Sequence, residues 1–234
     1  MATITRMAEE ETPDGAGAFL RLLSWVSPAF PTGGYAYSHG LEWAVETGDV
    51  HDVATLCAWI TCLFDHGAPG SDLIILQEAW RMGAEIEPLR ELAAFACACA
   101  SSRERYEETI YQGEAFLKAA NSWQVAPEPE ALRGQRWPLP VAQGMVFRRG
   151  GISRHQALLA GGYATLAALV SSAVRLVPLG QTDGLQTLAR LDPLLVRLVA
   201  LTGARTLDDV GGACFRSDLA AMHHETQTTR LFRT

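Results

Sequence analysis

A dense group of proline, glycine and aromatic residues near the N-terminus, between two helical patterns, constrains this chain most. It reads Ser27-Pro28-Ala29-Phe30-Pro31-Thr32-Gly33-Gly34-Tyr35-Ala36-Tyr37-Ser38-His39-Gly40-Leu41-Glu42-Trp43. Each proline fixes its own φ and restricts the residue before it, whereas Gly33 and Gly34 permit positive φ angles. We therefore predict that this segment, the Ser27–Trp43 loop, is a sharp, defined reversal between two helices.

Apolar residues elsewhere recur with the spacing of amphipathic helices, and no segment alternates long enough to predict a strand. Ser153 with Gln156 forms a capping box, and Asp192 followed by Pro193 is predicted to begin another helix. Helices are expected at 19–26, 41–45, 53–64, from 71 or 72, and at 88–96, 106–117, 153–174, 192–201 and from 217 or 218. The pattern predicts an all-α, single-domain orthogonal helical bundle.

Two stretches lack this periodicity. Residues 125–151 contain four prolines, which predicts a long connection with one short helix at 141–148. Residues 1–17 carry one arginine against four acidic side chains, so a disordered acidic tail is expected there, without a signal peptide or membrane span. Residues 18–234 then form the helical domain, ending in a C-terminal tail.

Composition excludes some functions. The net charge is −7, and Lys118 is the single lysine, which argues against nucleic-acid binding. Apolar residues make up 48% and charged residues 19% of the chain, which favours a surface partly used by protein partners. The five cysteines follow no zinc-binding spacing, and a reducing cytoplasm fits them best. Cys97 and Cys99, among alanines, are interpreted as core fillers.

No catalytic set is apparent. The Gly33-Gly34 segment has no Lys-Ser/Thr pair and follows a helix, so it does not match a phosphate-binding loop. Ser38-His39 and Asp65-His66 are neighbours in sequence rather than a triad in space, which leaves a cryptic hydrolase centred on Ser38 as a third alternative. We predict that the protein is not an enzyme.

The sequence His223-His224-Glu225 offers ligand types that nickel or zinc accept, and supports an alternative function as a nickel-binding metallochaperone. Adjacent helical positions project about 100° apart, however, so His223 and His224 do not converge easily on one ion. We interpret them as surface histidines and predict no intrinsic metal site or cofactor.

The chain ends in Arg230-Leu231-Phe232-Arg233-Thr234. An exposed Leu-Phe pair is unfavourable in water unless it docks, and arginine is favoured at protein interfaces. This predicts a tail ordered by a partner. The alternative is a tail folded onto its own bundle.

With both ends considered, the chain resembles the urease accessory protein UreF family. The resemblance rests on four segments in the family's order, which are 27–42, Gln112-Gly113-Glu114-Ala115-Phe116-Leu117, Val177-Pro178-Leu179-Gly180-Gln181-Thr182-Asp183-Gly184, and 217–234. Phe30 and Tyr35 stand where the family usually has Leu and Phe, and residues 125–151 match only at Pro140 and Gly144.

The resemblance implies a non-catalytic nickel-insertion chaperone that bridges UreD/UreH and the GTPase UreG, regulates GTP hydrolysis and supports nickel delivery to apo-urease. It also implies a homodimer within that complex, with nickel handled by the complex as a whole. Tyr163 is assigned to the dimer or GTPase face. The residues that match the family's partner-binding motifs are Pro31, Gly33, Gly34, Tyr37, Ser38, Glu42, His224, Glu225, Arg230, Leu231, Phe232 and Arg233.

Overall fold

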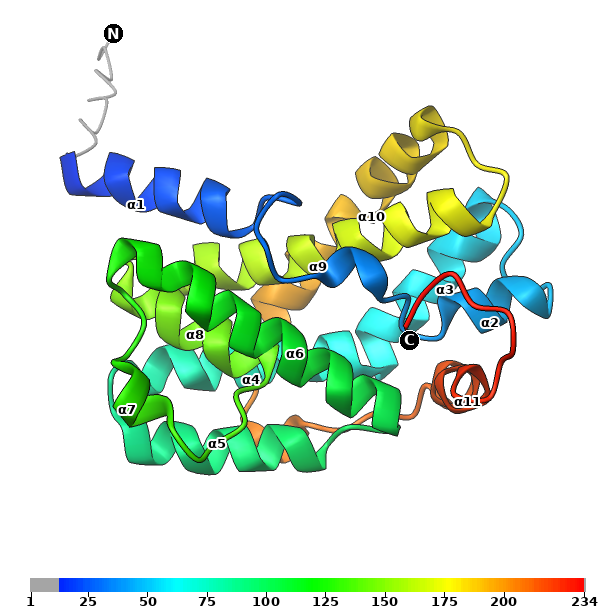
Figure 1. Ribbon diagram of the computed structural model, residues 1–234. Helices are drawn as coiled ribbons and strands as arrows, with labels where there is room; N and C mark the ends of the chain where they lie inside the picture. Colours follow the sequence, from blue (N-terminus) through cyan, green and yellow to red (C-terminus); the bar gives the residue numbers. More distant parts are fainter. Residues whose placement is uncertain (1–12, 234) are drawn as a thin grey trace, which may run out of the picture.

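The computed structural model describes residues 13–233, which form helices joined mostly by short loops (Figure 1). No described segment forms a β-strand, which confirms the all-α prediction. The α-helices are α1 Pro13–Trp25, α2 Leu41–Glu46, α3 Val53–His66, α4 Ala68–Met82, α5 Ile86–Ala98, α6 Arg103–Ala120, α7 Pro129–Leu132, α8 Leu139–Arg149, α9 Arg154–Leu176, α10 Gln181–Thr202 and α11 Phe215–His224. The 3-10 helices are η1 Gly34–Ala36, η2 Asn121–Trp123 and η3 Leu207–Asp209.

Helices α4 and α8 form the centre of the bundle. Their mutual contact is the most extensive between any two elements, and α8 also packs on α6 and α9. A Cβ at Gly144 would lie 2.4 Å from the Leu76 carbonyl oxygen, so glycine is what allows the two backbones to approach. Figure 1 shows α6 and α9 running across the view while α11 is seen nearly end-on, so the helices cross rather than align.

The short helix predicted at 141–148 within the long connection is confirmed as α8, which begins two residues earlier and ends one residue later than predicted. Residues 139–149 form α8, and every side chain from Pro140 to Phe147 is buried. Pro138 is the N-cap of this helix and Pro140 lies in its first turn, where a missing N–H costs no helical hydrogen bond. The prolines therefore start a core helix instead of preventing one.

Three predicted helix starts also differ from the structure. Pro193 lies inside α10, which begins at Gln181, where the Asp183 carboxylate accepts a hydrogen bond from the Gly180 N–H at 2.9 Å. Helix α4 begins at Ala68 rather than at 71 or 72, and α11 begins at Phe215 rather than at 217 or 218. In each case capping side chains in the sequence suggested a start that lies within the helix.

The N-terminal helix is longer than predicted. Helix α1 begins at Pro13, so residues 13–17 of the expected disordered tail are helical, and residues 1–12 lie outside the described residues. Trp25 stacks on Phe147 of α8 with ring centroids 6.0 Å apart. Arg21 donates a hydrogen bond to the Gly150 carbonyl oxygen at 3.0 Å. Both contacts fix α1 to the end of α8.

Helix α9 has the length and hydropathy of a membrane span, but 50% of its most apolar window is buried inside the bundle. It packs against α10 and α4, so its apolar composition is accounted for by core packing. The predicted capping box is confirmed, because the Ser153 Oγ atom accepts a hydrogen bond from the Gln156 N–H at 3.3 Å.

The prediction that Cys97 and Cys99 fill the core is not met. Cys97 is half-buried and Cys99 is exposed. Cys99 is the C-cap of α5, so it lies beyond the apolar face that α5 turns toward the bundle.

Candidate functional site

The Ser27–Trp43 loop forms the predicted reversal and packs directly on α11. Gly33 and Gly40 have φ angles of +75° and +74°. A Cβ at Gly40 would lie 2.7 Å from the Ala221 backbone nitrogen, so the loop touches α11 where a side chain would not fit. Ser38 is fully buried, and its Oγ atom accepts a hydrogen bond from the Glu42 N–H at 3.3 Å. A buried, hydrogen-bonded Ser38 is no accessible nucleophile, which removes the basis of the hydrolase alternative.

Glu42, at the start of α2, binds the C-terminal tail. Its Oε1 atom accepts a hydrogen bond from the Leu231 N–H at 2.6 Å, and its Oε2 atom accepts one from the Phe232 N–H at 2.9 Å. The Glu42 side chain is 9% exposed, so these bonds form away from water and contribute more than surface bonds do. One carboxylate therefore holds two consecutive backbone amides of the tail.

His224, the last residue of α11, lies between two carboxylates. Its Nδ1 atom is 2.8 Å from Glu104 Oε2, and its Nε2 atom is 3.0 Å from Glu42 Oε2. A neutral imidazole has only one N–H, so the cluster needs one further proton, on the ring or on a carboxyl group, for both contacts to be hydrogen bonds. Burial raises the pKa of Glu104, against the opposing effects of His224 and Arg230. The interpretation of His224 as a surface histidine is wrong, since its side chain is 0% exposed.

The tail completes this cluster and docks on its own bundle, which is the alternative to the predicted ordering by a partner. Arg230 Nη1 donates to Glu104 Oε1 at 2.9 Å, and the Arg233 N–H donates to the Ala36 carbonyl oxygen at 2.7 Å. Phe232 is 4% exposed, whereas its neighbour Leu231 is 64% exposed. The tail thus has an inward anchor and an outward apolar side chain within two residues.

Arg175, on α9, joins the loop to the tail. Its guanidinium lies 4.3 Å from the centroid of the Phe232 ring, and Nη1 donates to the Tyr35 carbonyl oxygen at 2.7 Å. Ser172, one turn earlier, donates to the Tyr37 carbonyl oxygen at 3.1 Å. Burial raises the pKa of the Tyr37 phenol, and the adjacent Arg233 opposes that shift. The last turns of α9 therefore support both the Ser27–Trp43 loop and the C-terminal tail.

The residues of the metallochaperone alternative do not converge. The His223 ring stacks on Trp43 at a centroid distance of 5.0 Å, while His224 points into the carboxylate cluster. Glu225 Oε1 accepts a hydrogen bond from the Arg103 N–H at 3.0 Å, at the start of α6. Within residues 13–233, no group of three or more His, Cys, Asp or Glu side chains is arranged to hold a metal ion.

A second buried polar cluster lies beneath the loop, around His39. Its Nε2 atom is 3.2 Å from both Glu108 Oε1 and Arg105 Nη1, and Arg105 also pairs directly with Glu108. Gln112 Nε2 donates to Glu108 Oε1 at 3.0 Å. Burial lowers the pKa of His39 to about 4, with the Arg105 charge adding to the effect and Glu108 opposing it. His39 is therefore neutral at pH 7.

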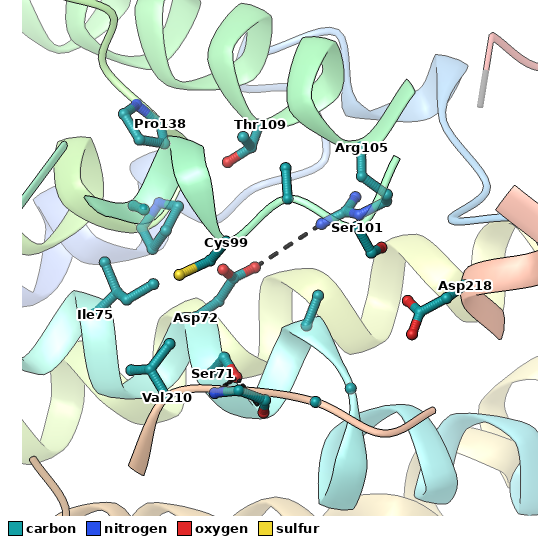
Figure 2. A pocket seen from close by; sticks show the side chains of 17 residues that line it. Ser71, Asp72, Ile75, Cys99, Ser101, Arg105, Thr109, Pro138, Val210 and Asp218 are labelled. Carbon is teal, nitrogen blue, oxygen red and sulfur yellow. Dashed lines mark hydrogen bonds and ion pairs between the residues drawn. The ribbon is translucent and has the colours of Figure 1, made fainter. Parts of the chain in front are cut away.

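Two cavities meet at this cluster. The larger, of about 320 Å³, lies under the Ser27–Trp43 loop, and the smaller, of about 120 Å³, lies between α4 and α6. Asp72, Arg105 and Thr109 line both. Figure 2 shows Arg105 reaching toward Asp72 across the smaller cavity, with 3.9 Å between Nη2 and Oδ2. Burial raises the pKa of Asp72 to about 6, although Arg105 opposes the shift.

The structure brings most of the predicted site residues together. Glu42, His224 and residues 230–233 form one cluster, and Tyr37 and Ser38 are buried beside it. Pro31 is exposed in the loop, and Tyr163 is 43% exposed on α9. Sequence reasoning missed five charged or ionisable members, namely His39, Glu104, Arg105, Glu108 and Arg175. The available signal in the sequence was the four-residue spacing of Glu104, Glu108 and Gln112 on α6. The same spacing is typical of a solvent-exposed helix face, so it did not identify these residues as part of the site.

The fold and the site define a class of protein: an all-helical bundle whose buried charges hold its own C-terminal tail against an N-terminal loop. The sequence model of the UreF family matches residues 50–192. Proteins named urease accessory protein UreF from Rhodopseudomonas palustris (strain BisA53), Agrobacterium fabrum and Rhizobium leguminosarum bv. viciae are 44%, 43% and 45% identical. The alignments cover 94%, 94% and 93% of this chain and 94%, 98% and 96% of those relatives. The chain belongs to the UreF family.

Proposed function

We propose that this protein is a non-catalytic scaffold for urease maturation, which bridges UreD/UreH and the GTPase UreG and supports nickel delivery to apo-urease. Membership of the UreF family supports this role, because the relatives are named as accessory proteins of urease. The observation that carries it is the divided tail, in which Phe232 is buried and Leu231 is 64% exposed. An apolar side chain held outward on an ordered segment suits a protein partner.

The loop and tail provide the proposed face for UreD/UreH. Tyr35 is 77% exposed, and its backbone is tied by Arg175 to the same ring that anchors the tail. Leu231 therefore lies on a surface whose backbone is fixed before a partner arrives, which lowers the entropy cost of binding. The buried members, Glu42 and His224, act on a partner only by holding this surface in shape.

A second face is proposed for the homodimer or for UreG. On the outer sides of α9 and α10, which pack together, several large apolar side chains are exposed. They are Tyr163, Leu185, Val196 and Leu201, with exposed fractions of 43%, 68%, 59% and 46%. This surface lies on different helices from the loop and the tail, so a single copy has separate surfaces for two partners.

In this proposal the protein acts by holding its partners in place and not by catalysing a reaction. It binds the two nucleotide states of UreG with different free energies, and thereby couples GTP hydrolysis to nickel release. Nickel is the cargo of the whole complex, which works in the cytoplasm, and passes along a path shielded from solvent. The two cavities that share Asp72 and Arg105 are candidates for part of that path.

The test is reconstitution of urease activation from purified apo-urease, UreD/UreH, UreG, nickel and GTP, with and without this protein. We expect the protein to change the rate of GTP hydrolysis and to increase urease activity. No change in either quantity would overturn the proposal. Deleting residues 230–234 is expected to abolish co-purification with UreD/UreH while the far-ultraviolet circular dichroism stays helical, and unchanged co-purification would contradict the assignment of the tail.

A further inference from the structure

Two cysteines that are far apart in the chain lie in contact on the side of the bundle formed by α3 and the start of α11. The Sγ atoms of Cys62 and Cys214 are 3.3 Å apart, although 152 residues separate them. Cys62, on α3, is exposed, whereas Cys214, immediately before α11, is buried. This pair takes no part in the loop and tail cluster described above.

We propose that Cys62 and Cys214 form an oxidation site, a dithiol that closes to an intramolecular disulfide when a hydroperoxide reaches Cys62. The class of co-reactant is a small peroxide such as hydrogen peroxide, which the exposed Cys62 thiol can meet from solvent. Disulfides in a reducing compartment are characteristically transient and redox-sensing, which suits a contact between two free thiols.

The local backbone is arranged for closure. The Ala213 N–H donates to the His66 carbonyl oxygen at 2.8 Å, so the segment before α11 is already fixed to the end of α3. A Cβ at Gly67 would lie 3.2 Å from Cys214 Cβ, so glycine leaves the space that Cys214 occupies. Forming a bond of about 2.05 Å requires the sulfurs to approach by roughly 1.3 Å, which side-chain rotation and the non-helical backbone of Cys214 can supply.

The two thiols have different roles in the reaction. Cys62 takes a hydroxyl group from the peroxide to become a sulfenic acid, and water leaves. The Cys214 sulfur then attacks the Cys62 sulfur, the S–S bond forms, the S–O bond breaks, and the Cys214 proton leaves with the hydroxyl group as a second water. The two thiols together lose two electrons, which the peroxide gains. Cys62 meets the peroxide because it is exposed, and Cys214 resolves the sulfenic acid because its buried sulfur lies 3.3 Å from the Cys62 sulfur. Burial raises the pKa of the Cys214 thiol to about 12, so this thiol loses its proton only as it attacks.

Formation of the disulfide would attach α11 to α3, a helix that is not among the main neighbours of α11. Helix α11 packs chiefly on α2 and α6, as Figure 1 shows for α2. A disulfide would add a covalent link to α3 just before the segment that carries His224 and the tail. It would also close a loop of more than 150 residues, which restricts the unfolded chain and raises the melting temperature.

The test uses the full chain, treated with hydrogen peroxide and then alkylated under denaturing conditions. We expect two of the five thiols to become unavailable to alkylation, and a peptide map to join the Cys62 and Cys214 peptides. The midpoint of thermal unfolding is expected to rise after oxidation and to return after reduction. Cys62→Ser, a change at an exposed site, is expected to abolish the link and the rise, whereas Cys99→Ser, also at an exposed cysteine, is expected to keep both.

Retention of all five alkylatable thiols at peroxide concentrations that oxidise free glutathione would overturn the proposal. So would a disulfide mapped to another pair, or a covalent dimer linked through Cys62 as the main product. A Cys62→Ser variant that still showed the rise in melting temperature would also contradict it.

Discussion

The Glu42 Oε2 atom accepts a hydrogen bond from the Phe232 N–H at 2.9 Å, across 190 residues of chain. The same oxygen lies 3.0 Å from His224 Nε2, so one buried atom joins α2, α11 and the tail. Because a buried donor or acceptor that loses its partner is costly, the tail and the His224 cluster are expected to loosen together.

Glu42→Gln is expected to release the tail without unfolding the bundle. The amide nitrogen of glutamine would face a backbone N–H or the His224 ring, so one bond of the set is lost and the charge is removed. We expect the free energy of tail opening to fall by about 2 kcal/mol, which speeds amide exchange at Leu231 and Phe232 by about 30-fold. Hydrogen exchange measures this. Glu46→Gln, at an exposed position of the same helix, is the matched control, and equal effects of the two changes would contradict the role of Glu42.

Substitutions at Leu231 and Phe232 are expected to separate two properties of the tail, which are its docking on the bundle and its binding to UreD/UreH. Phe232→Ala removes the buried ring beneath Arg175, so tail amides should exchange as in an unfolded segment. Phe232 lies outside the main apolar core cluster, so the thermal midpoint of the bundle should change little. Leu231→Ala should leave exchange unaltered but weaken UreD/UreH binding by about tenfold, as for an exposed interface anchor. Faster exchange in Leu231→Ala would show that the exposed side chain also holds the tail.

Gly40→Ala is expected to destabilise the protein far more than Gly48→Ala. Both glycines have positive φ angles, +74° and +79°, so alanine strains each by about 1 kcal/mol. A Cβ at Gly48 meets nothing within 4 Å, whereas one at Gly40 would meet the α11 backbone at 2.7 Å, which adds roughly 2 kcal/mol of overpacking. Urea unfolding of both variants measures the difference. Similar midpoints would mean that the loop and α11 separate easily.

Helical periodicity predicted the helices well because it depends on local spacing, and it failed where local signals have two meanings. Pro138 and Pro140 suggested that the helix predicted at 141–148 starts only after them, although proline is suited to the start of a helix, and α8 has Pro138 as its N-cap and Pro140 in its first turn. Pro193 suggested a helix start for the same reason, but it lies inside α10. Only the surrounding helices decide between these possibilities.

The two segments that form the site, the Ser27–Trp43 loop and the C-terminal tail, were predicted from the sequence. The buried charged residues between them were not. The apolar pair Leu231 and Phe232 marked the tail as a segment that must dock, but nothing local shows that one ring is buried and the other side chain exposed. Glu104 is a buried charge because His224 and Arg230, more than 100 residues later, face it. Such partners are set by the tertiary fold, so a single sequence without related sequences does not pair them.

His39→Asn is expected to change how stability depends on pH. Asparagine accepts the positive φ of 56° at this position and stays uncharged. The pKa of His39 falls from 6.5 to about 4 on folding, so the folded state binds fewer protons than the unfolded state between these values. Its contribution is therefore complete above pH 6.5 and is lost as the pH falls through 4. From these values, the wild-type protein should lose about 2 kcal/mol relative to the variant between pH 8 and pH 5.

Asp72 acts in the opposite direction over part of this range, because its pKa is raised from 3.8 to about 6 and its contribution is lost as the pH rises. Arg105 and Glu108 face His39, and both variant and wild type retain them together with Asp72, so the difference between their stability curves isolates His39. Urea unfolding from pH 8 to pH 5 measures it, with His51→Asn, at an exposed histidine, as the control. Parallel curves for wild type and His39→Asn would mean that His39 is already protonated in the folded protein, with Glu108 compensating its charge.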